Sequence, residues 1–143
     1  MCLIVDTNFK TRVPFEEWTC RTWLWNTPRA RLVVGGLLLE ELAQDHDIRK
    51  FLAELDRAGR LRKFDRQEIE SAGKKVKVRL RSNDPHVIGL ALASGARTLA
   101  TFDAALRADF NDKRVIDNPR GAIFQNLPQH RKLLRHTKSC GIK

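Results

Sequence analysis

The chain has 143 residues, the length of one domain, and one domain can bury a substantial core without disulfides or a structural metal. It carries 27 Lys and Arg against 17 Asp and Glu, a net charge of +10, which favours anionic partners and above all nucleic acid. The longest apolar run, residues 32–39, is too short to cross a membrane, and the N-terminus has no signal-peptide pattern. The three cysteines form no CxxC pair, which argues against a zinc ribbon or a disulfide framework and is typical of a reducing compartment. We therefore expect a cytoplasmic protein that binds no membrane.

The N-terminal part of the chain alternates short apolar runs with helical periodicity. Residues 2–5 predict a buried strand that ends at Asp-Thr-Asn, a turn or helix cap. A helix is predicted over 14–26 and a second strand over 31–34. Leucines at helical spacing then predict a helix over 37–57, with a break at 45–47.

The same alternation continues to the C-terminus. A strand is predicted over 61–64 and a charged helix over 66–80. Asp84 and Pro85 suit the start of an apolar helix that ends at Gly95. The remaining predicted elements are a strand over 97–101, a helix over 104–110, a last strand over 114–116 and a basic helix over 125–138.

Strands that alternate with helices predict a three-layer α/β/α fold with a central parallel sheet, followed by a basic helical tail. We expect a single domain over residues 1–143, with a core of about 2–116 and a C-terminal extension of about 117–143. The ligand site of such a sheet lies at the carboxyl ends of its strands.

The positive charge is concentrated in two segments. Residues 57–81 hold ten Lys and Arg against three acids, and residues 113–143 hold eight against one. Basic clusters attract a phosphate backbone without reading its sequence, although each single side chain also suits a solvated surface. The predicted RNA-binding residues are Lys74, Lys75, Lys77, Arg79 and Arg81.

Several acids follow predicted strands or begin predicted helices. Asp6 follows the first strand, Asp84 begins the apolar helix and Asp103 follows the strand over 97–101. Glu41, with Glu40 as its one-residue alternative, lies one turn into the helix after the second strand. Each acid alone is explained by a helix cap or a solvated surface, but the fold brings them to one edge of the sheet.

Clustered carboxylates repel one another unless they share a cation. Mg²⁺ and Mn²⁺ prefer carboxylate and water oxygens, and one or two such ions can activate water for phosphodiester cleavage. Acids at the site within a basic surround therefore predict a Mg²⁺- or Mn²⁺-dependent nuclease.

The chain resembles the PIN-domain ribonucleases in LIVDTN at 3–8, LLLEELA at 37–43 and SNDPHVIGLALASGARTLATFDAALRADF at 82–110. This resemblance implies a parallel sheet flanked by helices and a Mg²⁺- or Mn²⁺-dependent endoribonuclease. It also implies a toxin of a toxin–antitoxin pair, with a cognate antitoxin and a homodimer as partners. The tryptophan-rich segment after Asp6 does not align with the family, and Phe102 stands where a small polar residue is common.

The resemblance assigns roles residue by residue. It makes Asp6, Glu41, Asp84 and Asp103 the four catalytic, metal-binding acids. The secondary site residues are Asn8, Thr101, Asp109 as an outer acid, and Glu40.

Two other hypotheses stay open. One is an RNA- or ribosome-binding module whose acids only cap helices. The other is a PIN nuclease of RNA processing or phage defence that has no antitoxin.

Overall fold

The computed structural model describes residues 2–117 and 119–134. Within them, five parallel strands form one sheet in the order β3-β2-β1-β4-β5. The strands are β1 (Cys2–Val5), β2 (Arg31–Gly35), β3 (Leu61–Phe64), β4 (Thr98–Ala100) and β5 (Ala122–Phe124). Every residue of β1 is buried, as expected for a central strand that is covered on both faces.

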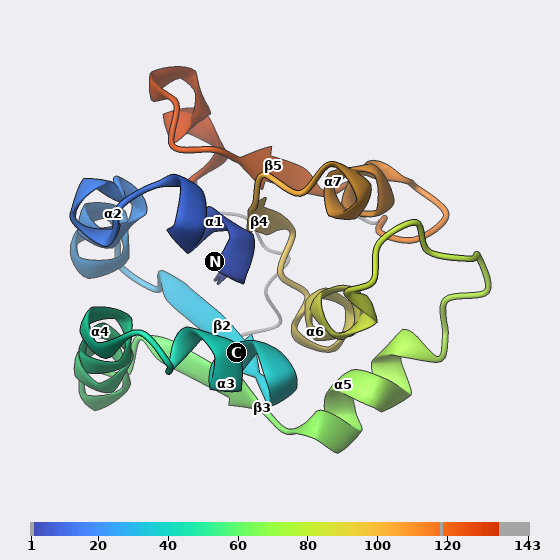
Figure 1. The fold of residues 1–143 in the computed structure, drawn as a ribbon, viewed down its shortest axis with the longest axis horizontal. Helices are drawn as coiled ribbons and strands as arrows, with labels where there is room; N and C mark the ends of the chain where they lie inside the picture. The colour runs from blue at the N-terminus through green and yellow to red at the C-terminus, as the bar shows by residue number, and fades with distance from the viewer. Residues whose placement is uncertain (1, 118, 135–143) are drawn as a thin grey trace.

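Helices cover both faces of the sheet, which confirms the three-layer α/β/α prediction. Figure 1 shows α2 and α4 on one side of the strands and α5, α6 and α7 on the other. The α-helices are α1 (Thr7–Arg12), α2 (Cys20–Asn26), α3 (Gly36–Leu42), α4 (His46–Arg57), α5 (Arg66–Gly73), α6 (Pro85–Ser94) and α7 (Ala104–Asn111). Short 3₁₀ turns lie at Phe15–Glu17 and Pro128–Leu133.

Local chemistry explains where several helices begin and end. The carboxylates of Asp45, Asp65 and Asp103 accept hydrogen bonds from the backbone N–H groups three residues ahead, so each caps the helix that follows. Asp45 thereby marks the predicted break between α3 and α4. Gly95 ends α6 in the left-handed conformation, with a φ of 80°, which glycine adopts without strain.

Close packing of α5 against α6 depends on Gly89. A Cβ atom at this position would lie 2.5 Å from the carbonyl oxygen of Ile69. The absence of a side chain at Gly89 therefore lets the two helices approach closely.

Two predicted helices are wrong in extent. The segment over 14–26 is interrupted at Trp18, which is buried in an extended conformation and donates its indole N–H to the carbonyl of Val13 at 2.9 Å. The helix predicted over 66–80 ends at Gly73. Residues 74–80 instead alternate apolar and basic side chains, a period that suits extended chain.

The C-terminal prediction is also partly wrong. Residues 114–116 form a turn rather than a strand, although Val115 and Ile116 are buried. The last strand lies later, at β5, where Ala122 donates its N–H to the carbonyl of Arg97 at 2.8 Å. The basic helix predicted over 125–138 is a 3₁₀ turn as far as it is described, and residues 135–138 lie outside the described part of the chain.

Two further sequence expectations concern membranes and cysteines. Among the described residues, no helix is long and apolar enough to span a bilayer. Cys20 is a buried free thiol, and burial raises its pKa to about 12. Cys2 is disulfide-bonded, a bond that the cysteine pattern, which argues against a disulfide framework, does not predict.

Candidate active site

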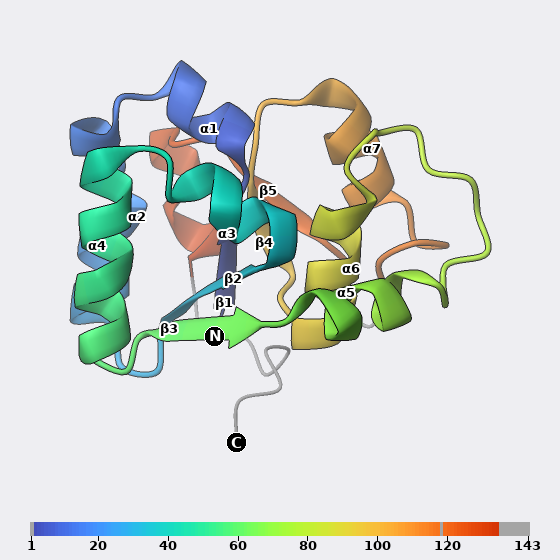
Figure 2. The ribbon, with the colours of Figure 1, turned by 60° about the horizontal axis from the view of Figure 1, so that its bottom comes forward.

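The candidate active site lies where the order of the strands reverses. From β1 the chain proceeds to β2 and β3 on one side of the sheet, whereas β4 and β5 lie on the other side of β1. In open parallel sheets the ligand site lies outside the carboxyl ends of the strands at such a switch point. Asp6 directly follows β1, and Asp103 follows β4 by three residues. Figure 2 shows α1, α3 and α7 along this edge.

Asp6 is held by hydrogen bonds from the start of α1 and from the residue that follows β4. The residue is buried, with only 3% of its surface exposed. Oδ1 accepts from the backbone N–H of Thr7 at 2.9 Å, and Oδ2 accepts from the Thr101 hydroxyl at 2.9 Å. The Thr101 Oγ1 atom in turn accepts the N–H of Asp103 at 3.1 Å. One buried threonine therefore links the two acids.

Asn8 fixes the loop that follows β4. Its Oδ1 atom accepts the backbone N–H of Phe102 at 2.8 Å. The Phe102 ring stacks on Phe9, with centroids 5.8 Å apart, and the Arg12 guanidinium lies 5.0 Å from the centroid of the Phe102 ring. Phe102 thus anchors α1 to the loop that carries Asp103.

Asp84 differs from the capping aspartates. It occupies the N-cap position of α6, yet its carboxylate makes no capping hydrogen bond, and Pro85 follows it at the first helical position. Its carboxylate is therefore not used as the helix cap that its position in the sequence suggested. A partly buried carboxylate without this bond is available to a ligand.

The predicted acids influence one another electrostatically. Burial raises the pKa of Asp6, and the negative charges of Asp84 and Asp103 raise it further, while the hydrogen bonds from Thr101 and Thr7 act in the opposite direction. Burial also raises the pKa of Asp84, the nearby His86 opposes this, and Asp103 and Glu41 add to it. We call Asp6, Glu41, Asp84 and Asp103 the acidic edge.

The two glutamates at the end of α3 have different surroundings. Glu40 is exposed and pairs with Arg66 across 3.5 Å. Glu41 is partly buried, and its charge is the one that raises the pKa of Asp84. Of the two, Glu41 therefore belongs to the acidic edge.

Asp109 is fully buried and does not lie among these four acids. Its carboxylate accepts the backbone N–H of Arg81 at 2.8 and 3.1 Å and that of Ser82 at 2.9 Å. It thereby holds the loop that leads into Asp84. Because it is fully buried, Asp109 is not a plain surface residue.

Two residues beside the acidic edge were not predicted as site residues. Lys10 donates its ammonium group to the backbone carbonyl of Glu41 at 3.3 Å. His86 lies close enough to Asp84 to lower its pKa. The position of His86 two residues after Asp84 was a weak signal for it, whereas no local pattern pointed to Lys10.

The predicted RNA-binding residues form an exposed segment between α5 and Asp84. Lys74, Lys75, Lys77 and Arg79 are exposed. Arg81 is also exposed and pairs with Asp109 at 3.7 Å and Asp112 at 3.4 Å. We call residues 74–81 the basic segment.

The acidic edge carries little compensating charge. Among the described residues, none of its four carboxylates forms an ion pair with Lys, Arg or His, since all such pairs involve other acids. In the same residues, no three His, Cys, Asp or Glu side chains converge to form a ready-made metal site. Within the described part of the chain, the edge therefore lacks paired cations and is not a closed cage of ligands.

Comparison with known proteins adds no relative: no family model matches the chain, and no curated protein or solved structure matches it significantly.

Proposed function

We propose that the protein is a Mg²⁺- or Mn²⁺-dependent endoribonuclease that hydrolyses RNA phosphodiester bonds at the acidic edge. The observation that carries this proposal is the carboxylate of Asp84, which begins α6 without capping it and is electrostatically coupled to Asp103 and Glu41. The resemblance of the sequence to PIN-domain ribonucleases supports the same assignment.

The chemistry of the four acids suits a hard divalent cation. Carboxylate oxygens are the ligands that Mg²⁺ prefers, and the ion is usually held by one or two carboxylates together with waters and substrate phosphates. An open edge without a three-ligand cage is compatible with that mode of binding. Asp6, Glu41, Asp84 and Asp103 are the candidate ligands, and one or two of these carboxylates would hold the cation together with waters and a substrate phosphate. When bound, it would polarise a phosphodiester oxygen and make water a better nucleophile.

The chain's own residues would perform the remaining tasks. Thr101 keeps the Asp6 carboxylate oriented through the 2.9 Å hydrogen bond. Asp109 holds the backbone before Asp84. The basic segment would attract the RNA backbone by releasing its counterions, and this attraction requires no particular base sequence.

Cleavage of a mixed RNA pool tests the proposal. The wild-type protein should cleave RNA with Mn²⁺ and not with excess EDTA, and Asp84→Asn should lower the rate at least about a hundredfold, the usual scale for loss of a catalytic group. Glu40→Gln is the matched control, because Glu40 lies next to Glu41 but pairs with Arg66 outside the acidic edge. Equal cleavage by Asp84→Asn and wild type would refute the proposal.

Thermal unfolding provides a second readout that does not depend on turnover. A cation that binds only the folded protein raises its melting temperature. Mn²⁺ should therefore stabilise the wild type and should stabilise Asp6→Asn/Asp84→Asn much less. Equal stabilisation of both proteins would place the cation elsewhere.

A non-catalytic RNA-binding module is the second candidate, and the basic segment is the observation that favours it. It predicts RNA binding that survives both EDTA and Asp84→Asn, with no cleavage under any condition. The cognate antitoxin and the homodimer rest on the family resemblance alone. Purification of the protein with its gene neighbours, and its mass in solution, would test these two partners.

A further inference from the structure

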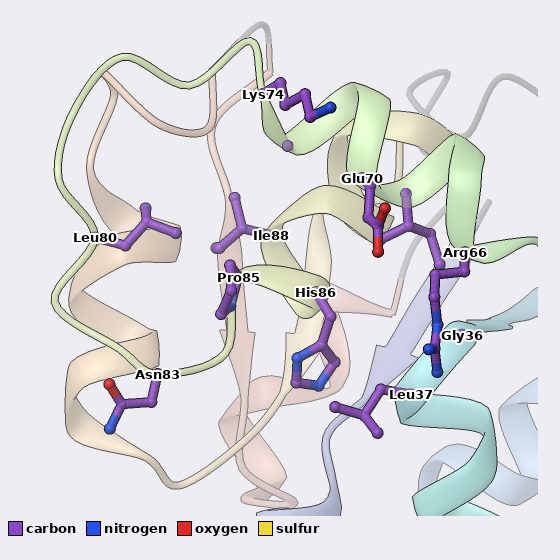
Figure 3. A pocket seen from close by; sticks show the side chains of 12 residues that line it. Gly36, Leu37, Arg66, Glu70, Lys74, Leu80, Asn83, Pro85, His86 and Ile88 are labelled. Carbon is purple, nitrogen blue, oxygen red and sulfur yellow. The ribbon is translucent and has the colours of Figure 1, made fainter.

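A cavity of about 590 Å³ opens between α5, α6 and the start of α3. Asn83 and Pro85, which line it, lie on either side of Asp84 in the sequence, and Gly36 and Leu37 come from the helix that carries Glu41. The cavity therefore lies beside the acidic edge. Figure 3 shows His86 projecting from α6 toward Leu37 and Arg66 reaching from α5 toward Gly36.

The lining combines apolar walls with a few polar groups. Leu37, Ile69, Leu80 and Ile88 supply apolar surface, while Arg66, Lys74 and Glu70 bring charge to the same cavity. A volume of 300–1,000 Å³ with mostly apolar walls and a few convergent polar groups is typical of a site for a small organic group. A flat ring with hydrogen-bonding edges fits this combination.

His86 provides independent evidence for a ligand. Its Nε2 atom is buried and has no hydrogen-bond partner among the described residues. Such an atom costs about 1–3 kcal/mol when it stays unpaired. His86 lines the cavity, so a bound ligand that displaced its ring would give this atom a polar partner.

The basic segment indicates which ligand brings this ring. Exposed basic side chains alternate with partly buried Val76, Val78 and Leu80, so one side of the segment packs on the core and the other faces solvent. Leu80 and Lys74 belong to both the segment and the cavity wall. An RNA strand whose phosphates lie along the basic segment would thus have its bases next to the cavity.

We propose that this cavity binds an unpaired nucleobase of single-stranded RNA next to the phosphodiester at the acidic edge. The inference rests on the proposed function, because it takes RNA as the substrate. Leu37 and Leu80, which line the cavity and are not fully buried, would pack against the faces of the base, and His86 and Asn83 would contact its edge. Proteins commonly recognise single-stranded RNA through bases that are splayed out, stacked and read at their edges.

Binding of short RNA in EDTA tests this site without cleavage. The probes are fluorescent single strands of about twelve nucleotides with normal bases, and abasic strands with the same backbone. Leu37→Ala should weaken binding of the normal strands about fivefold, the lower end of what one stacked base contributes, and should leave binding of the abasic strands unchanged. Leu37→Met, which keeps an apolar side chain of similar volume, should bind as the wild type does.

Leu127→Ala is the matched control. Leu37 is 42% exposed and Leu127 is 43% exposed, so both truncations should leave the fold intact, but Leu127 does not line the cavity. Equal weakening of normal and abasic strands by Leu37→Ala would overturn the proposal. An unchanged affinity in Leu37→Ala would also overturn it and would leave the apolar cavity to a protein ligand.

The outcomes separate this inference from the proposed function. If the wild type cleaves RNA with Mn²⁺ but Leu37→Ala shows no base-dependent loss of affinity, the proposed nuclease activity is supported and the proposed base site is refuted. If the base-dependent loss of affinity is found but no RNA is cleaved, the base site is supported and the nuclease activity is refuted.

Discussion

The Asp109 carboxylate accepts the backbone N–H of Ser82 at 2.9 Å inside the protein, across 27 residues of sequence. A second backbone N–H, from Arg81, reaches the same carboxylate. These hydrogen bonds hold the loop between the basic segment and Asp84. The order of this loop therefore depends on one buried acid that is not itself part of the acidic edge.

Asp109→Ala should lower the free energy of unfolding by about 3 kcal/mol, because two buried N–H groups lose a charged acceptor. Asp109→Asn should lose less, since one oxygen acceptor remains. Urea denaturation measures both changes. The rate of RNA cleavage should also fall, because the loop that positions Asp84 loses its hydrogen bonds to Asp109. Glu16→Ala, at an exposed acid, is the control. A loss in Glu16→Ala equal to that in Asp109→Ala would contradict the assignment.

Asp84→Asn should raise the melting temperature by a few degrees at neutral pH without metal. Burial and the neighbouring acids raise the folded-state pKa of Asp84 above its ordinary value of 3.8. The native state therefore holds this proton to a higher pH than the unfolded chain does, and stability falls as pH rises from about 3.8 through the raised pKa. The neutral amide removes this penalty.

Melting curves of wild type and Asp84→Asn in EDTA check this sign. The difference should be largest at about pH 7 and should vanish below the unfolded pKa of about 3.8, where the carboxylate is protonated in both states. A variant that is less stable than the wild type at neutral pH would show that the carboxylate stabilises the fold instead.

Asn8→Ala should destabilise the protein by about 1 kcal/mol, because the partly buried backbone N–H of Phe102 loses the oxygen that accepts its hydrogen bond. It should also lower the cleavage rate, since the loop that carries Asp103 loses its tie to α1. Asn8→Asp keeps the accepting oxygen and should retain the fold. Chemical denaturation and single-turnover cleavage would distinguish the two effects, and equal stability of all three proteins would mean that the hydrogen bond is dispensable.

Gly89→Ala should destabilise the protein by about 1–3 kcal/mol, because its Cβ would lie 2.5 Å from the Ile69 carbonyl oxygen and would push α5 away from α6. Gly73→Ala provides the matched comparison, since its Cβ would approach only the Cα of Gly89, at 3.8 Å. That variant should be neutral or slightly stabilising. Thermal melts of the two variants measure the difference, and equal melting temperatures would show that the helices can separate without cost.

The sequence predicts the central strands well because parallel strands buried on both faces are continuous apolar runs. The strands β1 and β2, the capping role of Asp103 and the break before α4 all follow from such local signals. The helix α1 was missed because it is short and polar and buries only Phe9, which leaves no periodic pattern. The prediction over 66–80 extends past the end of α5 because charged residues suit both an exposed helix and an exposed extended chain, whereas the helix ends at Gly73.

Long-range pairing explains the remaining differences. Val115 and Ile116 are as apolar as β5, and only the hydrogen bonds with β4 decide which segment becomes the strand. The same limit applies to the site. The pattern of strands and helices predicts that the four acids lie at one edge. It cannot reveal that the Asp84 carboxylate makes no capping hydrogen bond, that Asp109 is buried, or that Lys10 contacts Glu41.

The hydrogen bond between Thr101 and Asp6 joins residues that are 95 positions apart. During synthesis, Asp6 leaves the ribosome long before the strand that orients it exists. A nascent chain that ends between Arg81 and Thr101 therefore carries the basic segment but not a complete acidic edge. If the protein cleaves RNA, this order of assembly keeps the chain inactive toward the messenger and ribosome that are producing it until most of it has been made.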